Sequence, residues 1–486
     1  MTFPQPKPNT SRPPPSGKTP IQVVHISDTH VDLSYETGAS YNCTKPICCR
    51  PYTEADAPGN NDFPAGPYGE YTCDPPLSLE ESMFAAIESL IPDAAFTIFT
   101  GDVVAHDVWL VNENEVLTDL TTTYSQMATL KLVYPSVGNH DVAPVNAFPP
   151  LAIQSSSNTA QWAYNTMSTD WTTWVGTAAA QSVQDYGAYS ILYPGGNLRL
   201  ISFNSVFYYT DNFWLYSDPM ETDPSGQFAW LINELQGAET AGENVWLISH
   251  VPSGSGDFFR DYSNTFNQIV SRYDATIAAL FYGHTHADQF EIAYSDYTNP
   301  SFSNAFAMSY ITPSMTPTSG SPSFRVYSID PETFGVLDFT EYIANITSPS
   351  YQSGPVWTEY YSAKAAYGPY VTPPLTDPAA ELTPAFWHNV TEVFENDDTV
   401  FQEYYSRKSR GYLSATCTGS CKTSEICAMR AAEAQYNCAT VSPGVNFTKR
   451  KRDGKAVHED ECEGSRARAI FQAIAGRGVA QGAGRL

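Results

Sequence analysis

The chain of 486 residues is longer than one hydrophobic core usually fills, so we expect one large domain accompanied by something smaller. Its 9 Trp, 31 Tyr and 25 Phe exclude a chain that is disordered throughout. With 25 Lys and Arg against 52 Asp and Glu, the formal charge is −27. This charge excludes nucleic-acid binding as a main role, because such a surface repels phosphate backbones.

In chain order, the composition predicts four segments. Residues 1–20 are rich in proline and are expected to form an extended linker. Residues 21–347 alternate β-branched runs with helix-like stretches, which is typical of a layered α/β domain. Residues 348–448 look mostly helical and carry a cysteine cluster, and residues 449–486 form a basic tail that we expect to be disordered.

Apolar runs and amphipathic patterns locate the elements of the α/β domain. Buried strands are expected over residues 21–27, 95–100, 132–137, 245–249 and 278–282, with later strands over 305–311, 324–329 and 336–343. Helices are expected over residues 78–90, 228–239 and 264–273. Ser78 and Glu81 form a capping-box pattern at the start of the first helix.

Cysteines and sequons indicate an oxidising compartment. Nine cysteines, most of them in two tight groups, are typical of a secreted chain, and no apolar run is long enough to span a membrane. The first residues lack the apolar core of a signal peptide, so we expect a secreted or vacuolar/lysosomal protein whose signal is missing from this chain. The alternative is a cytosolic protein with chance sequons. Glycosylation sequons occur at Asn9, Asn42, Asn345, Asn389 and Asn446.

Five of the predicted strands run into residue types that bind metal ions. The residues are Asp28 and His30, Asp102, the run Asn139, His140 and Asp141, His250, and the pair His284 and His286. Groups just past the carboxyl ends of strands in open α/β sheets converge on one crevice. Glycine precedes Asp102, Asn139 and His284, where it allows a sharp turn. Each motif alone is common by chance, whereas all five in this order predict a metal site.

The five motifs resemble the signature of the calcineurin-like metallophosphoesterases, and several longer stretches resemble the acid sphingomyelinase family within that group. These stretches cover residues 100–109, 138–150, 211–214, 281–286 and 324–330, within a resemblance that spans about residues 18–448. The resemblance implies an α/β sandwich of four layers, in which two sheets are flanked by helices. It also implies a small C-terminal helical domain with disulfide bonds.

The resemblance implies two divalent metal ions, with zinc as the favoured ion. Matched by motif position, Asp28, His30 and His286 would hold the first ion. Asn139, His250 and His284 would hold the second, and Asp102 would bridge both. The implied reaction is the hydrolysis of sphingomyelin to ceramide and phosphocholine at a lipid surface, by a protein that we expect to be a monomer.

The leaving alkoxide needs a proton, and His140 and His106 are the candidates to donate it. The sequence leaves both open and favours His140, since His106 could instead orient a metal ligand. Asn146 matches a family position that lines the headgroup pocket. Nearby aromatic residues are expected to be core rather than pocket, namely Trp162, Trp171, Trp174, Phe213 and Trp214.

The resemblance also implies four disulfides: Cys43–Cys48, Cys49–Cys73, Cys417–Cys421 and Cys427–Cys438. Cys462 is left over in the tail. Two other functions stay open at this stage. One is a hydrolase of nucleotides or other small phosphodiesters from the sphingomyelinase-like branch, and the other is a secreted binding protein that kept the fold and lost catalysis.

Overall fold

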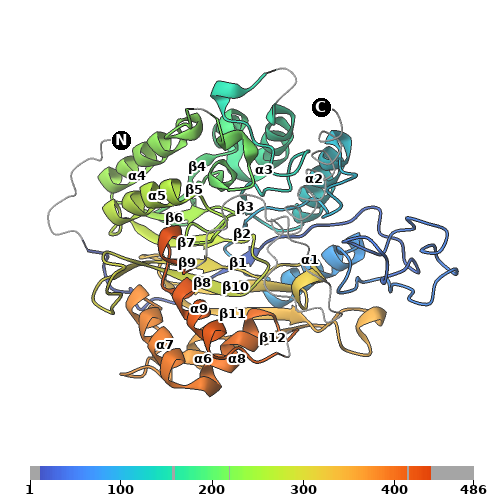
Figure 1. The fold of residues 1–486 in the computed structure, drawn as a ribbon. Coiled ribbons are helices and arrows are strands. Elements are labelled where there is room, and N and C mark those ends of the chain that lie inside the picture. Colours follow the sequence, from blue (N-terminus) through green and yellow to red (C-terminus); the bar gives the residue numbers. More distant parts are fainter. Residues whose placement is uncertain (1–10, 156–158, 218, 413–414, 439–486) are drawn as a thin grey trace, which may run out of the picture.

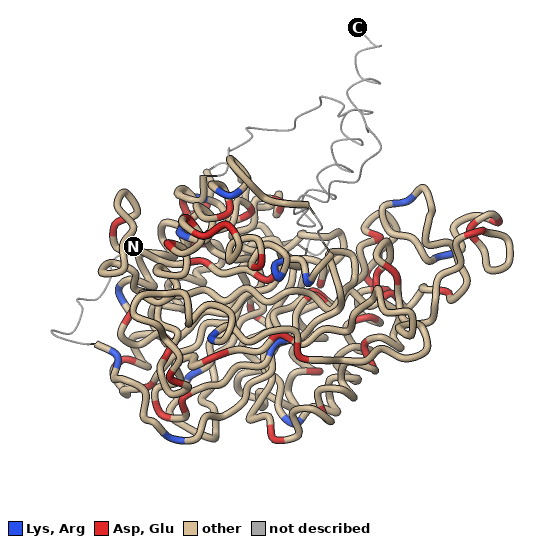
Figure 2. Tube along the Cα trace, turned by 90° about the horizontal axis from the view of Figure 1, so that it is seen from below, with Lys and Arg blue, Asp and Glu red and all other residues tan. Residues whose placement is uncertain are grey.

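The computed structural model describes residues 11–155, 159–217, 219–412 and 415–438. Two six-stranded sheets lie in the middle of the molecule, with α3, α4 and α5 above them and α6 to α9 below them in the view of Figure 1. This arrangement confirms the predicted sandwich of two sheets flanked by helices. In the part of the chain that the structure describes, acidic positions are spread over the molecule and outnumber the basic ones (Figure 2).

The first sheet has the strand order β12-β11-β10-β1-β2-β3. Its strands are β1 (Ile21–Ile26), β2 (Phe96–Phe99), β3 (Val133–Pro135), β10 (Ser323–Ile329), β11 (Val336–Ala344) and β12 (Trp357–Ser362). β1, β2 and β3 run parallel, whereas β10, β11 and β12 pair antiparallel. The sheet therefore continues past residue 347, because β12 pairs with β11 through residues that were expected to belong to the helical segment.

The second sheet has the strand order β4-β5-β6-β7-β9-β8. Its strands are β4 (Tyr189–Leu192), β5 (Leu198–Ser202), β6 (Asn244–Ile248), β7 (Ile277–Tyr282), β8 (Gln289–Tyr294) and β9 (Ala305–Ile311). β5, β6, β7 and β9 are parallel, and the edge strands β4 and β8 are antiparallel to their neighbours. The second sheet thus has a parallel centre, whereas the parallel strands of the first sheet form one half of it and end at its edge strand β3.

The helices are α1 (Leu77–Leu90), α2 (Glu113–Met127), α3 (Gln161–Tyr186), α4 (Gln227–Ala241), α5 (Arg260–Arg272), α6 (Ala363–Tyr367), α7 (Pro384–Asn396), α8 (Asp398–Lys408) and α9 (Ser420–Met429). All three predicted helices are present, but the predicted capping box is wrong. Pro76 occupies the N-cap position of α1 and makes no side-chain cap. Ser78 already lies in the first turn, where its hydroxyl donates to the carbonyl of Pro67 instead.

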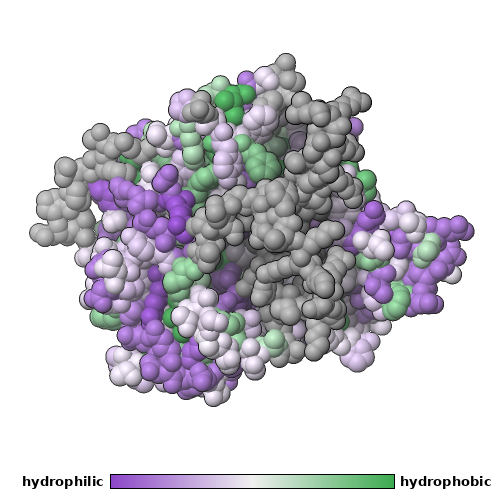
Figure 3. Space-filling model, in the orientation of Figure 1, coloured by the Kyte–Doolittle hydropathy of each residue, from purple (hydrophilic) through white to green (hydrophobic). Residues whose placement is uncertain are grey.

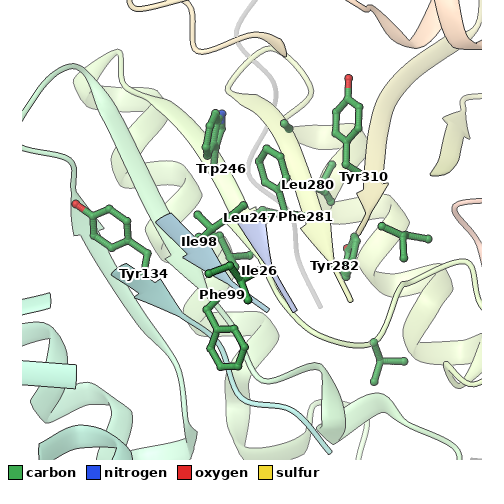
Figure 4. Close-up of a cluster of buried hydrophobic side chains, with 14 of the residues drawn as sticks. Ile26, Ile98, Phe99, Tyr134, Trp246, Leu247, Leu280, Phe281, Tyr282 and Tyr310 are labelled. Carbon is green, nitrogen blue, oxygen red and sulfur yellow. The ribbon is translucent and has the colours of Figure 1, made fainter. Parts of the chain in front are cut away.

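The core between the sheets is built from the apolar runs that predicted the strands. Figure 4 shows side chains from β1, β2 and β3 meeting those from β6, β7 and β9. The ring of Trp246 lies 5.5 Å from that of Phe96, and the ring of Phe281 lies 5.1 Å from that of Tyr327, so aromatic contacts join the two sheets. Burial of this apolar surface fixes where both sets of strands end, and hence where their loops meet.

Part of the predicted linker is bound to the folded domain. The Arg12 guanidinium donates to the carbonyls of Ala278 and Thr333, and the backbone N–H of Ser16 donates to the Asp330 carboxylate at 2.7 Å. Residues 11–20 therefore follow the surface of the α/β domain. In the part of the chain that the structure describes, no helix is both long enough and apolar enough to cross a bilayer.

Buried carboxyl groups make stability depend on pH. Burial raises the pKa of Glu80, Asp119 and Glu291 to about 8 in each case, so the folded chain keeps protons that the unfolded chain releases between about pH 4 and pH 8. The stability present at low pH is therefore lost as the pH rises through this window. Asp28 and Asp74 behave in the opposite way. Burial favours their neutral forms, but neighbouring histidines lower both pKa values. The stability that these two carboxylates contribute is therefore lost only as the pH falls below about 4.

We expect the free energy of unfolding, measured with denaturant and a chelator, to be at least roughly 2 kcal/mol larger at pH 5 than at pH 8. Glu80→Gln should reduce that difference, because the amide has no proton to lose. Glu88→Gln, on the exposed face of the same helix, is the matched control and should leave the difference unchanged. Equal stability at the two pH values would contradict this account.

Candidate metal centre

The strand ends bring all seven predicted ligands to one place. Loops after β1, β2 and β3 of the first sheet meet loops after β6 and β7 of the second. The seven side chains are all buried: Asp28, His30, Asp102, Asn139, His250, His284 and His286. Three groups among the described residues, each of three side chains, could hold a metal ion, and they draw on six of these seven residues together with His106.

One set of donor atoms surrounds the end of β1. His286 Nε2 lies 3.4 Å from Asp28 Oδ1. His30 Nε2 lies 4.0 Å from the same oxygen and 3.6 Å from Asp102 Oδ2. These four side chains present two carboxylates and two imidazoles to one point.

A second set lies on the other side of Asp102. His250 Nε2 lies 3.1 Å from Asp102 Oδ2 and 2.9 Å from Asn139 Oδ1. His284 Nδ1 lies 3.0 Å from the same amide oxygen. Asp102 Oδ2 therefore borders both sets, as a bridging carboxylate must.

The spacings fit metal ions. Ligand atoms about 2.1 Å from a tetrahedral zinc ion lie roughly 3.4 Å from one another, and the donor atoms here are 2.9–4.0 Å apart. Imidazole suits zinc, iron and manganese, and carboxylate and amide oxygens add affinity for harder ions. The donor set therefore fits two divalent ions without selecting one metal.

The backbone at these positions is held in an unusual conformation. Six of the eleven described non-glycine residues with positive φ are Asp28, His30, Asp102, Asn146, His284 and His286. Such left-handed conformations cost energy and concentrate at functional sites. Gly101 has φ +92°, as a sharp turn requires. At Gly283, glycine is required for space rather than for the sharp turn expected from the sequence. A Cβ there would lie 1.9 Å from Ser27 Oγ, because the two loops approach closely.

Main-chain carbonyls fix how two histidines present their rings. His30 Nδ1 donates to Val104 O, and His250 Nδ1 donates to Thr100 O, each at 2.7 Å. The Nε2 atom of each ring is then left to face the metal positions, as an orienting second partner usually ensures. The metal-free site also holds a proton: burial alone would lower the pKa of His250, but Asp102 and Asp28 raise it to about 9. A metal ion must displace this proton.

Asp141 joins two loops that carry predicted ligands, although it was only part of a motif in the sequence. Its carboxylate accepts hydrogen bonds from the backbone N–H groups of Gly138 and Val103, both at 2.8 Å. Burial and the charge of Asp102 raise the pKa of Asp141 to about 6. The loop that carries Asn139 is therefore tied to the loop that carries Asp102.

The two candidate proton donors have different surroundings. His106 Nδ1 lies 2.5 Å from Asp74 Oδ1, and the other oxygen of that carboxylate accepts the backbone N–H of His106 at 2.6 Å. The His106 ring stacks on His30 with 3.9 Å between centroids. The His140 ring lies 5.0 Å from both, and its backbone N–H donates to Asp102 Oδ1. Asp74 was missed, because a single Asp after Cys73 gives no signal in the sequence.

Asn146 lies beside the predicted ligand Asn139. It is buried, and its side-chain oxygen accepts a hydrogen bond from Asn139 Nδ2 at 2.9 Å.

The aromatic residues that were expected to be core are not all buried. Trp171 and Trp174 are core, as expected, whereas Phe213 and Trp214 are 59% and 38% exposed. The core prediction is therefore wrong for these last two, which lie in a short 3₁₀ turn, η3 (Phe213–Leu215), on the surface.

The cysteines pair as the resemblance implied. The disulfides are Cys43–Cys48, Cys49–Cys73, Cys417–Cys421 and Cys427–Cys438. The first two brace the lobe between β1 and α1, which projects from the molecule and presents mainly hydrophilic residues (Figure 3). Asn42 and Asn345 are exposed and Asn389 is half-buried. Asn9, Asn446 and Cys462 lie outside the described residues.

The C-terminal region holds the loop between β7 and β8, which carries two of the predicted ligands, in place. The buried guanidinium of Arg410 donates to the carbonyl of His286 and, at 2.7 Å, to that of Ser321. The backbone N–H of Asp288 donates to Lys408 O at 2.9 Å. The contacts with His286 and Asp288 join residues more than a hundred positions apart, and no sequence motif indicates them.

Comparison with known proteins agrees with this geometry. Residues 21–288 match the family described as calcineurin-like phosphoesterase, and residues 299–440 match the acid sphingomyelin phosphodiesterase C-terminal region. The chain belongs to the acid sphingomyelinase family of calcineurin-like phosphoesterases. It is 36% identical to a sphingomyelin phosphodiesterase of Homo sapiens over 85% of its own length, and 34% identical to sphingomyelin phosphodiesterase B of Dictyostelium discoideum over 89%.

The share of each relative's length that this chain matches differs among members of the family. It spans 64% of the human protein and 67% of the Dictyostelium protein. A cyclic GMP-AMP phosphodiesterase of Rattus norvegicus is 30% identical over 84% of this chain, and here the match covers 88% of the relative. The family is therefore shared by relatives whose names state different phosphodiester substrates.

Proposed function

We propose that the chain is a binuclear-metal phosphodiesterase that hydrolyses sphingomyelin to ceramide and phosphocholine. The observation that carries the proposal is the position of Asp102 Oδ2, which lies 3.6 Å from His30 Nε2 and 3.1 Å from His250 Nε2. One carboxylate oxygen between two buried ligand sets is what a pair of bridged cations requires. All seven ligands are present, which argues against a binding protein that has lost catalysis.

In this proposal, Asp28, His30 and His286 hold the first ion, Asn139, His250 and His284 hold the second, and Asp102 holds both. The ions, of which zinc is our favoured choice, would stabilise negative charge on the phosphoryl oxygens and lower the pKa of bound water. The protein positions the seven donor side chains and buries them away from solvent. The carbonyl partners of His30 and His250 and the carboxylate of Asp141 do this.

We propose His106 as the residue that protonates the leaving ceramide oxygen, in place of the initial preference for His140. Asp74 holds His106 Nδ1, so only Nε2 can face the substrate. Burial alone would raise the pKa of Asp74, but its contacts with His106 keep that pKa below the ordinary value, so the carboxylate stays ionised and favours a protonated imidazole. His140, whose ring lies 5.0 Å from that of His106, would contact the phosphoryl group.

A second candidate substrate is a nucleotide or another small phosphodiester. It is favoured by the rat cyclic GMP-AMP phosphodiesterase, because the chain matches 88% of that relative against 64% of the human sphingomyelin phosphodiesterase. The reaction and the ligands would be the same. Only the groups beyond the phosphate would differ.

A comparative assay separates the two substrates. The metal-loaded chain would be given sphingomyelin in detergent micelles and, separately, a cyclic dinucleotide, with Asp102→Asn as the inactive control. We expect kcat/KM to be higher for sphingomyelin. A preference for the dinucleotide would move the proposal to the second candidate. Hydrolysis of neither substrate by a chain that holds two metal ions would favour a binding protein.

We further propose a secreted or vacuolar/lysosomal protein that works as a monomer at a lipid surface. Four disulfides fit an oxidising compartment, because thiols stay reduced in the cytosol. The net charge of −27 would weaken association with acidic membranes at neutral pH, and this repulsion falls as carboxylates gain protons. Binding to vesicles of neutral and acidic lipids at pH 5 and pH 7.5 would test this.

A further inference from the structure

Asn146 and Asn139 are joined twice within the loop that follows β3. The backbone N–H of Asn146 donates to the carbonyl of Asn139 at 2.9 Å. In return, Asn139 Nδ2 donates to the side-chain oxygen of Asn146, also at 2.9 Å. Asn146 is only 2% exposed, so solvent cannot easily replace either bond. The two residues are therefore held together by two buried hydrogen bonds, which we call the Asn139–Asn146 unit.

This unit decides which end of the Asn139 amide faces the second metal position. An amide has an oxygen that accepts and an NH2 group that donates. Because the NH2 group is turned toward Asn146, the oxygen is turned toward His250 Nε2 and His284 Nδ1, at 2.9 and 3.0 Å. The reversed amide would present NH2 to the metal position, and an NH2 group cannot bind a cation.

We infer that Asn146 is a positioning residue that holds Asn139 as a metal ligand. The inference rests on the proposed binuclear centre. It follows that the identity of residue 146 sets the affinity of the second ion, whichever phosphodiester is cleaved. Partners of this kind typically change metal affinity or activity roughly 10- to 100-fold when they are removed.

The backbone at Asn146 offers a matched pair of variants. Its φ is +68°, a left-handed conformation that Gly, Asn and Asp tolerate well. Asn146→Gly keeps this conformation and removes the acceptor. Asn146→Asp keeps both, and its carboxylate can only accept, so it fixes the Asn139 amide in the same orientation. An Ala variant would add backbone strain and is avoided.

The first measurement is metal binding to the whole chain without substrate. Wild type should hold two zinc ions per chain by elemental analysis, and competition with a chelating dye should give both affinities. We expect Asn146→Gly to bind the second ion roughly 10- to 100-fold more weakly, and Asn146→Asp to bind it like wild type. Thermal unfolding of the metal-free proteins checks that each variant is folded.

The second measurement compares sphingomyelin with bis(p-nitrophenyl) phosphate, which has no choline. At limiting zinc, Asn146→Gly should lower kcat for both substrates by a similar factor, and excess zinc should restore much of it. Normal binding of two ions by Asn146→Gly, with a higher KM for sphingomyelin only, would overturn the inference and return Asn146 to the headgroup pocket. So would loss of the second ion in Asn146→Asp. A wild-type chain that holds fewer than two ions would instead refute the binuclear centre itself.

Discussion

Asp102→Asn should reduce kcat/KM for any phosphodiester substrate by roughly 10³-fold or more and weaken the binding of both metal ions. The change is isosteric, and the remaining oxygen can still accept the backbone N–H of His140. What is lost is the negative charge at Oδ2, between His30 Nε2 and His250 Nε2. Because both ligand sets share that oxygen, neither ion keeps its full complement of charge.

The measurement is metal content after gel filtration together with steady-state kinetics at saturating zinc. Asp338→Asn is the matched control, because its carboxylate bonds Ser362 and Lys364 near β11, away from the ligand loops. The control should keep both ions and full activity. An Asp102→Asn variant that binds two ions with unchanged affinity would show that Asp102 does not bridge them.

The place of the candidate site in the fold could be predicted from the sequence, because its predicted ligands follow buried strands. A short and mainly apolar segment such as Phe96–Phe99 predicts a buried strand, and the residue types after it are visible in the sequence. The second sheet was predicted only in part. Its edge strand β4 has only four residues, of which one is buried, so its pattern is weak. Helix α3 was missed because it mixes Trp, Thr and Ser and contains Gly176 at φ +74°.

The side chains that support the ligands could not be predicted in the same way. Asp74 reaches His106 from a loop braced by the Cys49–Cys73 disulfide, and Arg410 reaches His286 from the C-terminal region. Each is a single polar residue with no periodic pattern around it, and its role exists only once the loops have packed. The exposure of Phe213 could not be predicted either, since aromatic composition does not tell which rings are exposed on the surface.

Asp74→Asn should lower kcat for sphingomyelin by roughly 10²-fold or more while the chain keeps both metal ions. The ring and the backbone N–H of His106 donate to different oxygens of Asp74, and asparagine replaces one of these oxygens with an NH2 group that cannot accept. It also loses the charge that favours a protonated imidazole. A general acid works only in its protonated form, so the alkaline limb of the kcat profile should move to lower pH.

The leaving group distinguishes proton donation from a structural effect. Nitrophenolate leaves without a proton, so Asp74→Asn and His106→Ala should hydrolyse bis(p-nitrophenyl) phosphate almost as wild type does, and fail mainly on sphingomyelin. His140→Ala is the comparison, since its ring lies 5.0 Å from that of His106, whereas the Asp74 carboxylate bonds the His106 ring. We expect it to slow both substrates alike. If His140→Ala alone showed the leaving-group dependence, His140 would be the proton donor; if Asp74→Asn lost a metal ion, His106 would belong with the ligands.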